Sequence, residues 1–184
     1  MKKIIISLLT LFLALPLISL ADKTPKPVKL PWLTVTQTIE ISAAPETVWG
    51  KIKDFNGLNT WHPAVAKSEI VSGTNNQKGA VRLLTLQDGG TIKEKLLRYN
   101  YANKSMSIKY TIIEGVLPVS HYVSVISIKP GKGGGSVVEW YGKFQRKSQL
   151  AFPPAGEDDA TATNTITSVY KAGLENLKKL AEGD

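Results

Sequence analysis

The 184-residue chain contains no cysteine and only two histidines, His62 and His121. A chain without cysteine forms no disulfide framework, Cys-based zinc site, iron–sulfur cluster, thiol nucleophile or covalently attached c-type haem. Two histidines are also too few for a histidine-rich metal site. We therefore expect no metal and no cofactor. The remaining composition, 42% hydrophobic and 21% charged, is that of an ordinary globular protein.

Long hydrophobic runs are equally scarce, and the one that is present begins the chain. Two lysines precede the apolar run Ile4–Ile18, and small residues at Ser19 and Ala21 follow it. This layout predicts a secretory signal peptide over residues 1–21, cleaved after Ala21, and hence a periplasmic protein. The alternative is an uncleaved anchor, but the run falls short of the about 20 residues that span a bilayer.

Positive charge exceeds negative charge, partly because of the segments before the domain. The chain has 23 Lys and Arg against 15 Asp and Glu, a formal net charge of +8. Loss of Lys2 and Lys3 with the signal peptide lowers the charge to +6. Residues 22–31, with three prolines and three lysines, predict an extended leader, and a single domain at 32–184 retains +4. This charge suits docking on an acidic protein, whereas export and the lack of an Arg/aromatic cluster argue against nucleic-acid binding.

The sequence of the domain predicts mostly β-strands. Residues Leu33–Ile41 alternate between apolar and polar, which is typical of a half-buried strand. Six further short strands are predicted at Val65–Val71, Ala80–Leu86, Thr91–Tyr99, Ser105–Ile113, His121–Lys129 and Val137–Arg146. Hairpin-length connections join them, so the sheet should be antiparallel.

Helical patterns occur only after the first strand and at the end of the domain. Pro45 is placed to open a short helix, and Leu58–Trp61 predicts one further short turn. Asp158–Glu182 predicts a long amphipathic helix. The expected class is α+β, with a curved seven-stranded antiparallel sheet wrapped around the long C-terminal helix, which covers its apolar face.

This order of elements resembles the helix-grip fold of the SRPBCC superfamily, which includes START domains, polyketide cyclases and the birch-pollen allergen. The resemblance spans Leu33 to Leu180. The local sequence is similar to the MxaD-like periplasmic proteins of methylotrophic bacteria in five segments, which are Val48–Leu58, Trp61–Val65, Gly79–Arg82, Gly115–Ser120 and Val138–Trp140. The resemblance implies a non-catalytic accessory role in methanol oxidation. The implied partners are the quinone-dependent methanol dehydrogenase and its cytochrome c.

Hairpin geometry predicts which strand residues face inward. Asp88-Gly89 is a favoured two-residue type I′ turn. Such a turn places Leu83 opposite Glu94 on the concave face, with Arg82 and Leu84 on the solvent side. The next hairpin would then place Glu94 opposite Tyr110, whose hydroxyl group would relieve the desolvation of the carboxylate.

The inward positions define an apolar, aromatic-lined cavity under the long helix. Its predicted residues are Trp61, His62, Leu83, Glu94, Tyr110, Tyr122, Trp140, Phe144 and Tyr170. A cavity of this kind suits an apolar small molecule held by one or two polar groups. The alternative is a filled core that binds nothing.

Two ionisable groups leave the function open. Glu94 is either a general acid or base, if burial raises its pKa, or a carboxylate satisfied by Tyr110. His62 either lines the cavity mouth or packs in the core. Besides the accessory role, the sequence therefore allows a carrier of a lipid or other apolar molecule unrelated to methanol oxidation. It also allows a cyclase- or lyase-type enzyme, which only the superfamily suggests.

Overall fold

The computed structural model describes residues 28–102 and 105–183. The predicted signal peptide at 1–21 and residues 22–27 of the predicted leader lie outside the described residues. The elements follow in the order β1 (Leu33–Ile41), α1 (Pro45–Ile52), the 3-10 helix η1 (Phe55–Thr60), β2 (Val65–Ser72), β3 (Val81–Leu86), β4 (Thr91–Ala102), β5 (Ser105–Gly115), β6 (Val119–Pro130), the 3-10 turn η2 (Lys132–Gly134), β7 (Ser136–Arg146) and α2 (Asp159–Glu182).

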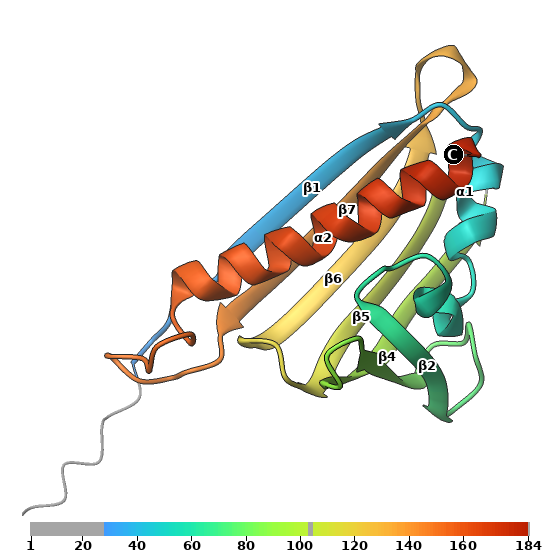
Figure 1. Cartoon of the computed structure of the whole chain (residues 1–184). Coiled ribbons are helices and arrows are strands. Elements are labelled where there is room, and N and C mark those ends of the chain that lie inside the picture. Colours follow the sequence, from blue (N-terminus) through green and yellow to red (C-terminus); the bar gives the residue numbers. More distant parts are fainter. Residues whose placement is uncertain (1–27, 103–104, 184) are drawn as a thin grey trace, which may run out of the picture.

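The strands form one antiparallel seven-stranded sheet in the order β1-β7-β6-β5-β4-β3-β2. In Figure 1, α2 lies along the curved sheet in front of β7 and β6, and α1 lies near the C-terminal end of α2. Strands β1 and β2 form the two opposite edges of the sheet. This arrangement confirms the predicted α+β helix-grip fold. Within residues 28–102 and 105–183, no helix is long and apolar enough to cross a membrane.

The core lies between α2 and the concave face of the sheet. On β7 every second residue is buried, including Val138, Trp140 and Phe144. On α2 the buried residues recur at helical spacing and are Ala162, Ile166, Tyr170, Gly173, Leu174 and Leu177. The two periodicities, 2.0 for the strand and 3.6 for the helix, therefore bring one face of each element into contact.

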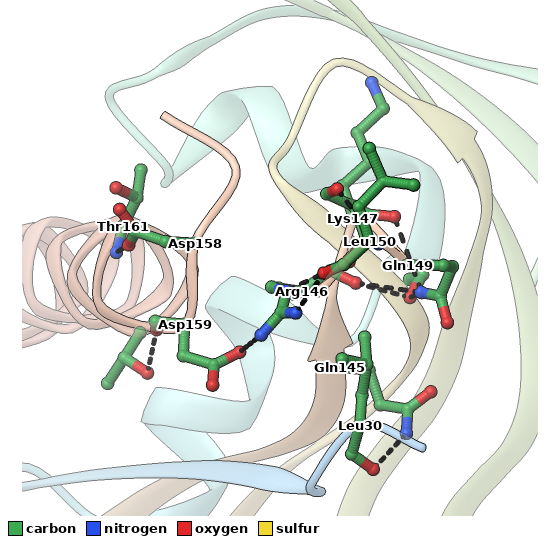
Figure 2. Close-up of polar contacts among 12 residues, drawn as sticks. Leu30, Gln145, Arg146, Lys147, Gln149, Leu150, Asp158, Asp159 and Thr161 are labelled. Atoms are coloured by element: carbon green, nitrogen blue, oxygen red, sulfur yellow. Dashed lines mark hydrogen bonds and ion pairs between the residues drawn. The ribbon is translucent and has the colours of Figure 1, made fainter. Parts of the chain in front are cut away.

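The loop between β7 and α2 is organised by one buried arginine, Arg146 (Figure 2). Its guanidinium donates to the carbonyl oxygens of Ser148 and Leu150 at 3.0 and 2.6 Å, and it pairs with the Asp159 carboxylate at 3.1 Å. Asp158 caps α2 by accepting a hydrogen bond from the Thr161 N–H at 2.6 Å. These contacts tie the end of β7 to the first turn of α2 and set where the helix begins over the sheet.

The predicted register of the β3–β4 hairpin is wrong by one residue. Leu86 N–H donates to the Gly90 carbonyl at 2.8 Å, and Gly89 N–H donates to the Leu86 carbonyl at 3.0 Å. Gly89 has a φ of 86°. These are the features of a three-residue loop with a left-handed glycine, not of a two-residue turn. The longer loop pairs Arg82, rather than Leu83, with Glu94.

A one-residue shift reverses the faces of a strand, because side chains alternate with a period of two. Leu83 was predicted to line the cavity, but it lies on the outer face. Arg82 and Leu84, predicted to face solvent, are buried at 4% and 1% exposure. The β4–β5 register also differs, because irregularities in the ladder pair Glu94 with Ile112 instead of Tyr110.

Candidate functional site

A cavity of about 70 Å³ lies between α2, η1 and the sheet. Fifteen side chains line it, and most of them are apolar. They are Leu58, His62, Ala64, Val65, Leu84, Leu86, Ile92, Glu94, Tyr110, Ile112, Leu117, Tyr122, Trp140, Ile166 and Val169. An apolar cavity with a few polar groups is the usual form of a small-molecule site.

The structure brings five of the nine predicted cavity residues to this cavity, namely His62, Glu94, Tyr110, Tyr122 and Trp140. Trp61 lines a neighbouring void of about 20 Å³. Phe144 and Tyr170 are fully buried in the core. Leu83 does not take part, for the reason given above.

Two buried charged side chains at the site, Arg82 and Glu94, form an ion pair. The Nη2 and Nε atoms of Arg82 both approach Glu94 Oε2, at 2.6 and 2.7 Å. Arg82 Nη1 donates to the Phe55 carbonyl oxygen, and the guanidinium lies 4.1 Å from the centre of the Phe55 ring. Burial raises the pKa of Glu94, and the charge of Arg82 opposes that rise. The carboxylate's partner is thus Arg82 and not, as predicted, Tyr110.

A chain of hydroxyl groups crosses the core beside this ion pair. Ser124 Oγ lies 2.9 Å from Tyr170 Oη and 2.9 Å from the Tyr141 carbonyl oxygen. Tyr170 Oη lies 2.5 Å from Tyr122 Oη. Trp140 Nε1–H is shared between Ser124 Oγ at 3.0 Å and Tyr110 Oη at 3.1 Å. The interior therefore holds a connected polar network rather than isolated polar atoms, as burial requires.

The buried tyrosines of this network act through hydrogen bonds, not through ionisation. Burial, together with the negative charge of Glu94, raises the pKa of Tyr110 to about 12. Burial also raises the pKa of Tyr122 and of Tyr170 well above the ordinary value. A general base should instead titrate near the working pH.

Two glycines allow α2 and the sheet to approach closely at the network. A Cβ atom on Gly142 would lie 2.3 Å from Tyr170 Oη. A Cβ atom on Gly173 would lie 2.6 Å from His62 Cδ2 and 2.8 Å from Trp140 Cζ3. Contacts this short are not tolerated in a packed interior. Glycine at these two positions therefore leaves the space that the Tyr170 hydroxyl and the Trp140 ring occupy.

His62 links the segment after η1 to α2 through hydrogen bonds. Its Nε2 lies 3.0 Å from the Val169 carbonyl oxygen, and its Nδ1 lies 3.2 Å from the Ala64 backbone nitrogen. An N–H at Nε2 and a lone pair at Nδ1 satisfy both contacts, so we assign the neutral Nε2–H form. Burial lowers the pKa of His62, and the nearby charge of Arg82 acts in the same direction. Asn176 Nδ2 adds a second link by donating to the Trp61 carbonyl at 2.8 Å.

Sequence reasoning missed Arg82 and Ser124 at the site. Arg82 was missed because its face depends on the length of a loop. Ser124 lies on the inward face between Tyr122 and Ile126, and its position in that alternation was the available signal. No group of three or more His, Cys, Asp or Glu residues able to hold a metal occurs within the described part of the chain.

Sheet, helix and cavity together define a helix-grip protein, and comparison with known proteins identifies its family. Residues 33–182 match the family of polyketide cyclases/dehydrases and lipid transport proteins, and the chain belongs to this family. MLP-like protein 423 of Arabidopsis thaliana is 29% identical over 119 residues, which are 59% of this chain and 73% of that protein.

Solved structures of bacterial proteins are similar over most of the domain. The protein XoxI of Bacillus cereus is 33% identical, with a TM-score of 0.68 over 80% of this chain and 94% of that one. A Bacillus thuringiensis protein of uncharacterised function is also 33% identical, with a TM-score of 0.69 over 83% of this chain and 100% of that one. These likenesses support the fold and the superfamily and assign no activity.

Proposed function

We propose that this chain is an exported, non-catalytic protein that binds a small, largely apolar molecule in the cavity beneath α2. The observation that carries the proposal is the cavity itself, which has an apolar lining interrupted by Glu94, Tyr110, Tyr122 and His62. Family membership supports it, because the family is described as including lipid transport.

Binding suits these groups better than catalysis does. Arg82 engages Glu94, and both ring nitrogens of His62 have backbone partners. The buried tyrosines do not ionise near neutral pH, because burial raises their pKa values. The cavity is also small, about 70 Å³, against the about 300–1,000 Å³ of common ligand pockets. A small molecule therefore fits this cavity better than a lipid does.

A cavity-filling variant tests the binding proposal. Val169 lines the cavity from α2, and its neighbour Ser168 is exposed. We expect xenon, a small apolar probe, to bind the wild-type protein and the Ser168→Phe control, and Val169→Phe to abolish binding because its ring occupies the cavity. Xenon NMR measures this, and native mass spectrometry of protein from its own host looks for a retained molecule. Failure of xenon to bind, with no retained mass, contradicts the proposal.

We further propose that the protein works as a periplasmic accessory factor in methanol oxidation, with methanol dehydrogenase or its cytochrome c as partner. The five segments that resemble MxaD-like proteins support this proposal. The likeness to the protein XoxI of Bacillus cereus also supports it.

The outer face of the sheet offers a surface for such a partner. Arg98 and Lys109 are paired directly across β4 and β5, and Lys95 lies on the same face, opposite Thr111. Among the ion pairs formed by the described residues, none involves these three cations. Like charges opposite one another destabilise a sheet, and an acidic partner surface would relieve the repulsion.

Charge substitutions on this face test the partner proposal. We expect the wild-type protein to bind purified methanol dehydrogenase or its cytochrome c at low ionic strength. The triple substitution Lys95→Gln, Arg98→Gln, Lys109→Gln should slow association at least about tenfold. The matched control replaces the exposed helix residues Lys51, Lys171 and Lys179 with Gln and should have little effect. No binding at low salt, together with unchanged methanol oxidation in a deletion strain, would refute the accessory role.

A further inference from the structure

Two exposed aromatic side chains lie at the end of the sheet where β1 begins and β7 ends. Phe152, in the loop between β7 and α2, is 91% exposed, and Trp32, just before β1, is 52% exposed. The two segments are joined, because Gln145 Nε2 donates to the Leu30 carbonyl oxygen at 2.9 Å. Figure 1 shows the loop after β7 beside the start of β1 at this end of the molecule. Large apolar side chains that gather in solvent at one end of a protein mark an interaction surface.

An ordered loop holds Phe152 in solvent. Buried Arg146 donates to the carbonyl oxygens of Ser148 and Leu150, and Leu150 stands two residues before Phe152 (Figure 2). Pro153-Pro154 follows directly. A proline ring fixes its own φ and restricts the residue before it to extended conformations. The backbone is therefore constrained on both sides of Phe152, and transfer of its ring from water into a partner costs little conformational entropy.

Three exposed lysines belong to the same end of the molecule. Lys143 Nζ lies 4.8 Å from the centre of the Trp32 ring. Lys29 precedes Trp32 in the chain, and Lys147 follows β7 directly. Among the ion pairs formed by the described residues, none involves these three lysines. Their positive charge is therefore available to an anionic partner.

The acidic residues at the end of the loop do not cancel this charge. Asp158 caps α2, and Asp159 pairs with Arg146. Glu157 is thus the remaining acid of the three, against three lysines. In the sequence, residues 22–27 add two further lysines and one aspartate. The balance at this end is positive.

We propose that this end, which we call the docking end and define by Trp32, Phe152, Lys29, Lys143 and Lys147, binds the surface of an anionic phospholipid membrane. The two aromatic rings enter the boundary between headgroups and acyl chains, where they leave water. The lysine ammonium groups bind the anionic headgroups around them. The docking is peripheral, goes beyond the proposed function, and does not depend on whether the cavity holds a ligand.

The composition of the docking end fits a membrane better than a protein partner. A stable protein interface needs roughly 800 Å² on each side, with a hydrophobic core that is depleted in lysine. At the docking end the aromatic side chains are few and lysines stand among them, with Lys143 against the Trp32 ring. A membrane surface accepts single protruding rings between cations, because lipids rearrange around each side chain.

Vesicle co-sedimentation of the exported form of the protein, purified from its host, tests the proposal. The probes are vesicles of phosphatidylglycerol mixed with phosphatidylcholine, and vesicles of phosphatidylcholine alone. We expect the wild-type protein to bind the anionic vesicles at least about tenfold more tightly, and added salt to weaken that binding. Phe152→Ser should weaken it about tenfold, because the ring no longer leaves water. The triple substitution Lys29→Gln, Lys143→Gln, Lys147→Gln should weaken it at least about tenfold.

Matched controls come from other parts of the surface. Val71→Ser removes an exposed apolar side chain from β2, at the opposite edge of the sheet from β1. Lys78→Gln, Lys129→Gln, Lys132→Gln removes three exposed charges in or beside the β2–β3 and β6–β7 connections, at the far end of the sheet. Both controls should change vesicle binding by less than about twofold.

Three results would overturn the proposal. The first is failure of the wild-type protein to bind anionic vesicles, and the second is equal binding to both kinds of vesicle. The third is wild-type binding by the Phe152→Ser variant. If Phe152→Ser instead abolishes binding to methanol dehydrogenase or its cytochrome c while vesicles are not bound, the docking end serves a protein partner and the membrane proposal is wrong. Xenon binding tests the cavity separately, so failure of this proposal leaves the ligand-binding role standing.

Discussion

Replacing Arg82 with methionine should lower the free energy of unfolding by about 3–5 kcal/mol, because it strands a buried carboxylate. Both members of the pair are buried, at 4% exposure each, and Arg82 also binds the Phe55 carbonyl. Removing the cation leaves burial as the main influence on Glu94 and should raise its pKa further. Denaturant unfolding of the wild-type and variant proteins measures the loss.

The pH dependence of this loss has a defined sign. The pKa of Glu94 is already raised in the folded state, so the folded protein holds its proton above the pH at which the unfolded chain releases it. Stability from such a group falls as pH rises from the unfolded pKa through the folded one. Arg82→Met should therefore cost more at pH 8 than at pH 5. A loss that is independent of pH would argue against Glu94 as the stranded group.

Two further variants test whether the loss of stability comes from burial of the Arg82–Glu94 pair or from the loss of any ion pair. Arg82→Met combined with Glu94→Leu should recover much of the loss, since apolar replacement of a whole buried pair is often neutral or stabilising. Lys93→Met breaks the exposed pair with Glu114, whose N–O distance is 2.8 Å. It should change stability little, because solvent screens exposed pairs. If Lys93→Met were as damaging as Arg82→Met, burial would not be the cause.

Replacing Gly142 with alanine should destabilise the fold by about 1–3 kcal/mol through overpacking. The added Cβ would lie 2.3 Å from Tyr170 Oη, which is held by Ser124 and Tyr122. Tyr170→Phe removes that oxygen, and the nearest remaining atom, Cζ, is 3.3 Å away. The double variant should therefore lose less stability than the two single losses added together, as a thermal or denaturant double-mutant cycle would measure.

Gly50 is the matched control for this prediction. It lies in α1, and a Cβ atom built on it meets nothing within 4 Å. Gly50→Ala should stabilise the protein by about 0.4–1 kcal/mol, because alanine loses less backbone entropy in a helix than glycine does. Simple additivity of Gly142→Ala and Tyr170→Phe would show that the Tyr170 hydroxyl is not what the new methyl group meets.

Local patterns were sufficient to predict the elements. Alternation over Leu33–Ile41 and helical spacing over Asp158–Glu182 predicted β1 and α2 with their bounds nearly as observed. The inward faces of β6 and β7 were also predicted, since Tyr122, Trp140 and Phe144 are all buried. Side-chain direction in these elements depends on backbone periods of 2.0 and 3.6, which a sequence displays directly.

The sequence by itself determined the class of fold, the apolar concave face and the aromatic residues beneath the long helix. Only the tertiary structure decided the polar chemistry of the cavity. One additional residue in the loop Leu86–Gly90 turned Arg82 inward and Leu83 outward, so the partner of Glu94 became a cation rather than a phenol. Loop geometry and ladder irregularities set strand register, and register determines which charged side chain meets which across strands. No periodic pattern along the chain records that choice.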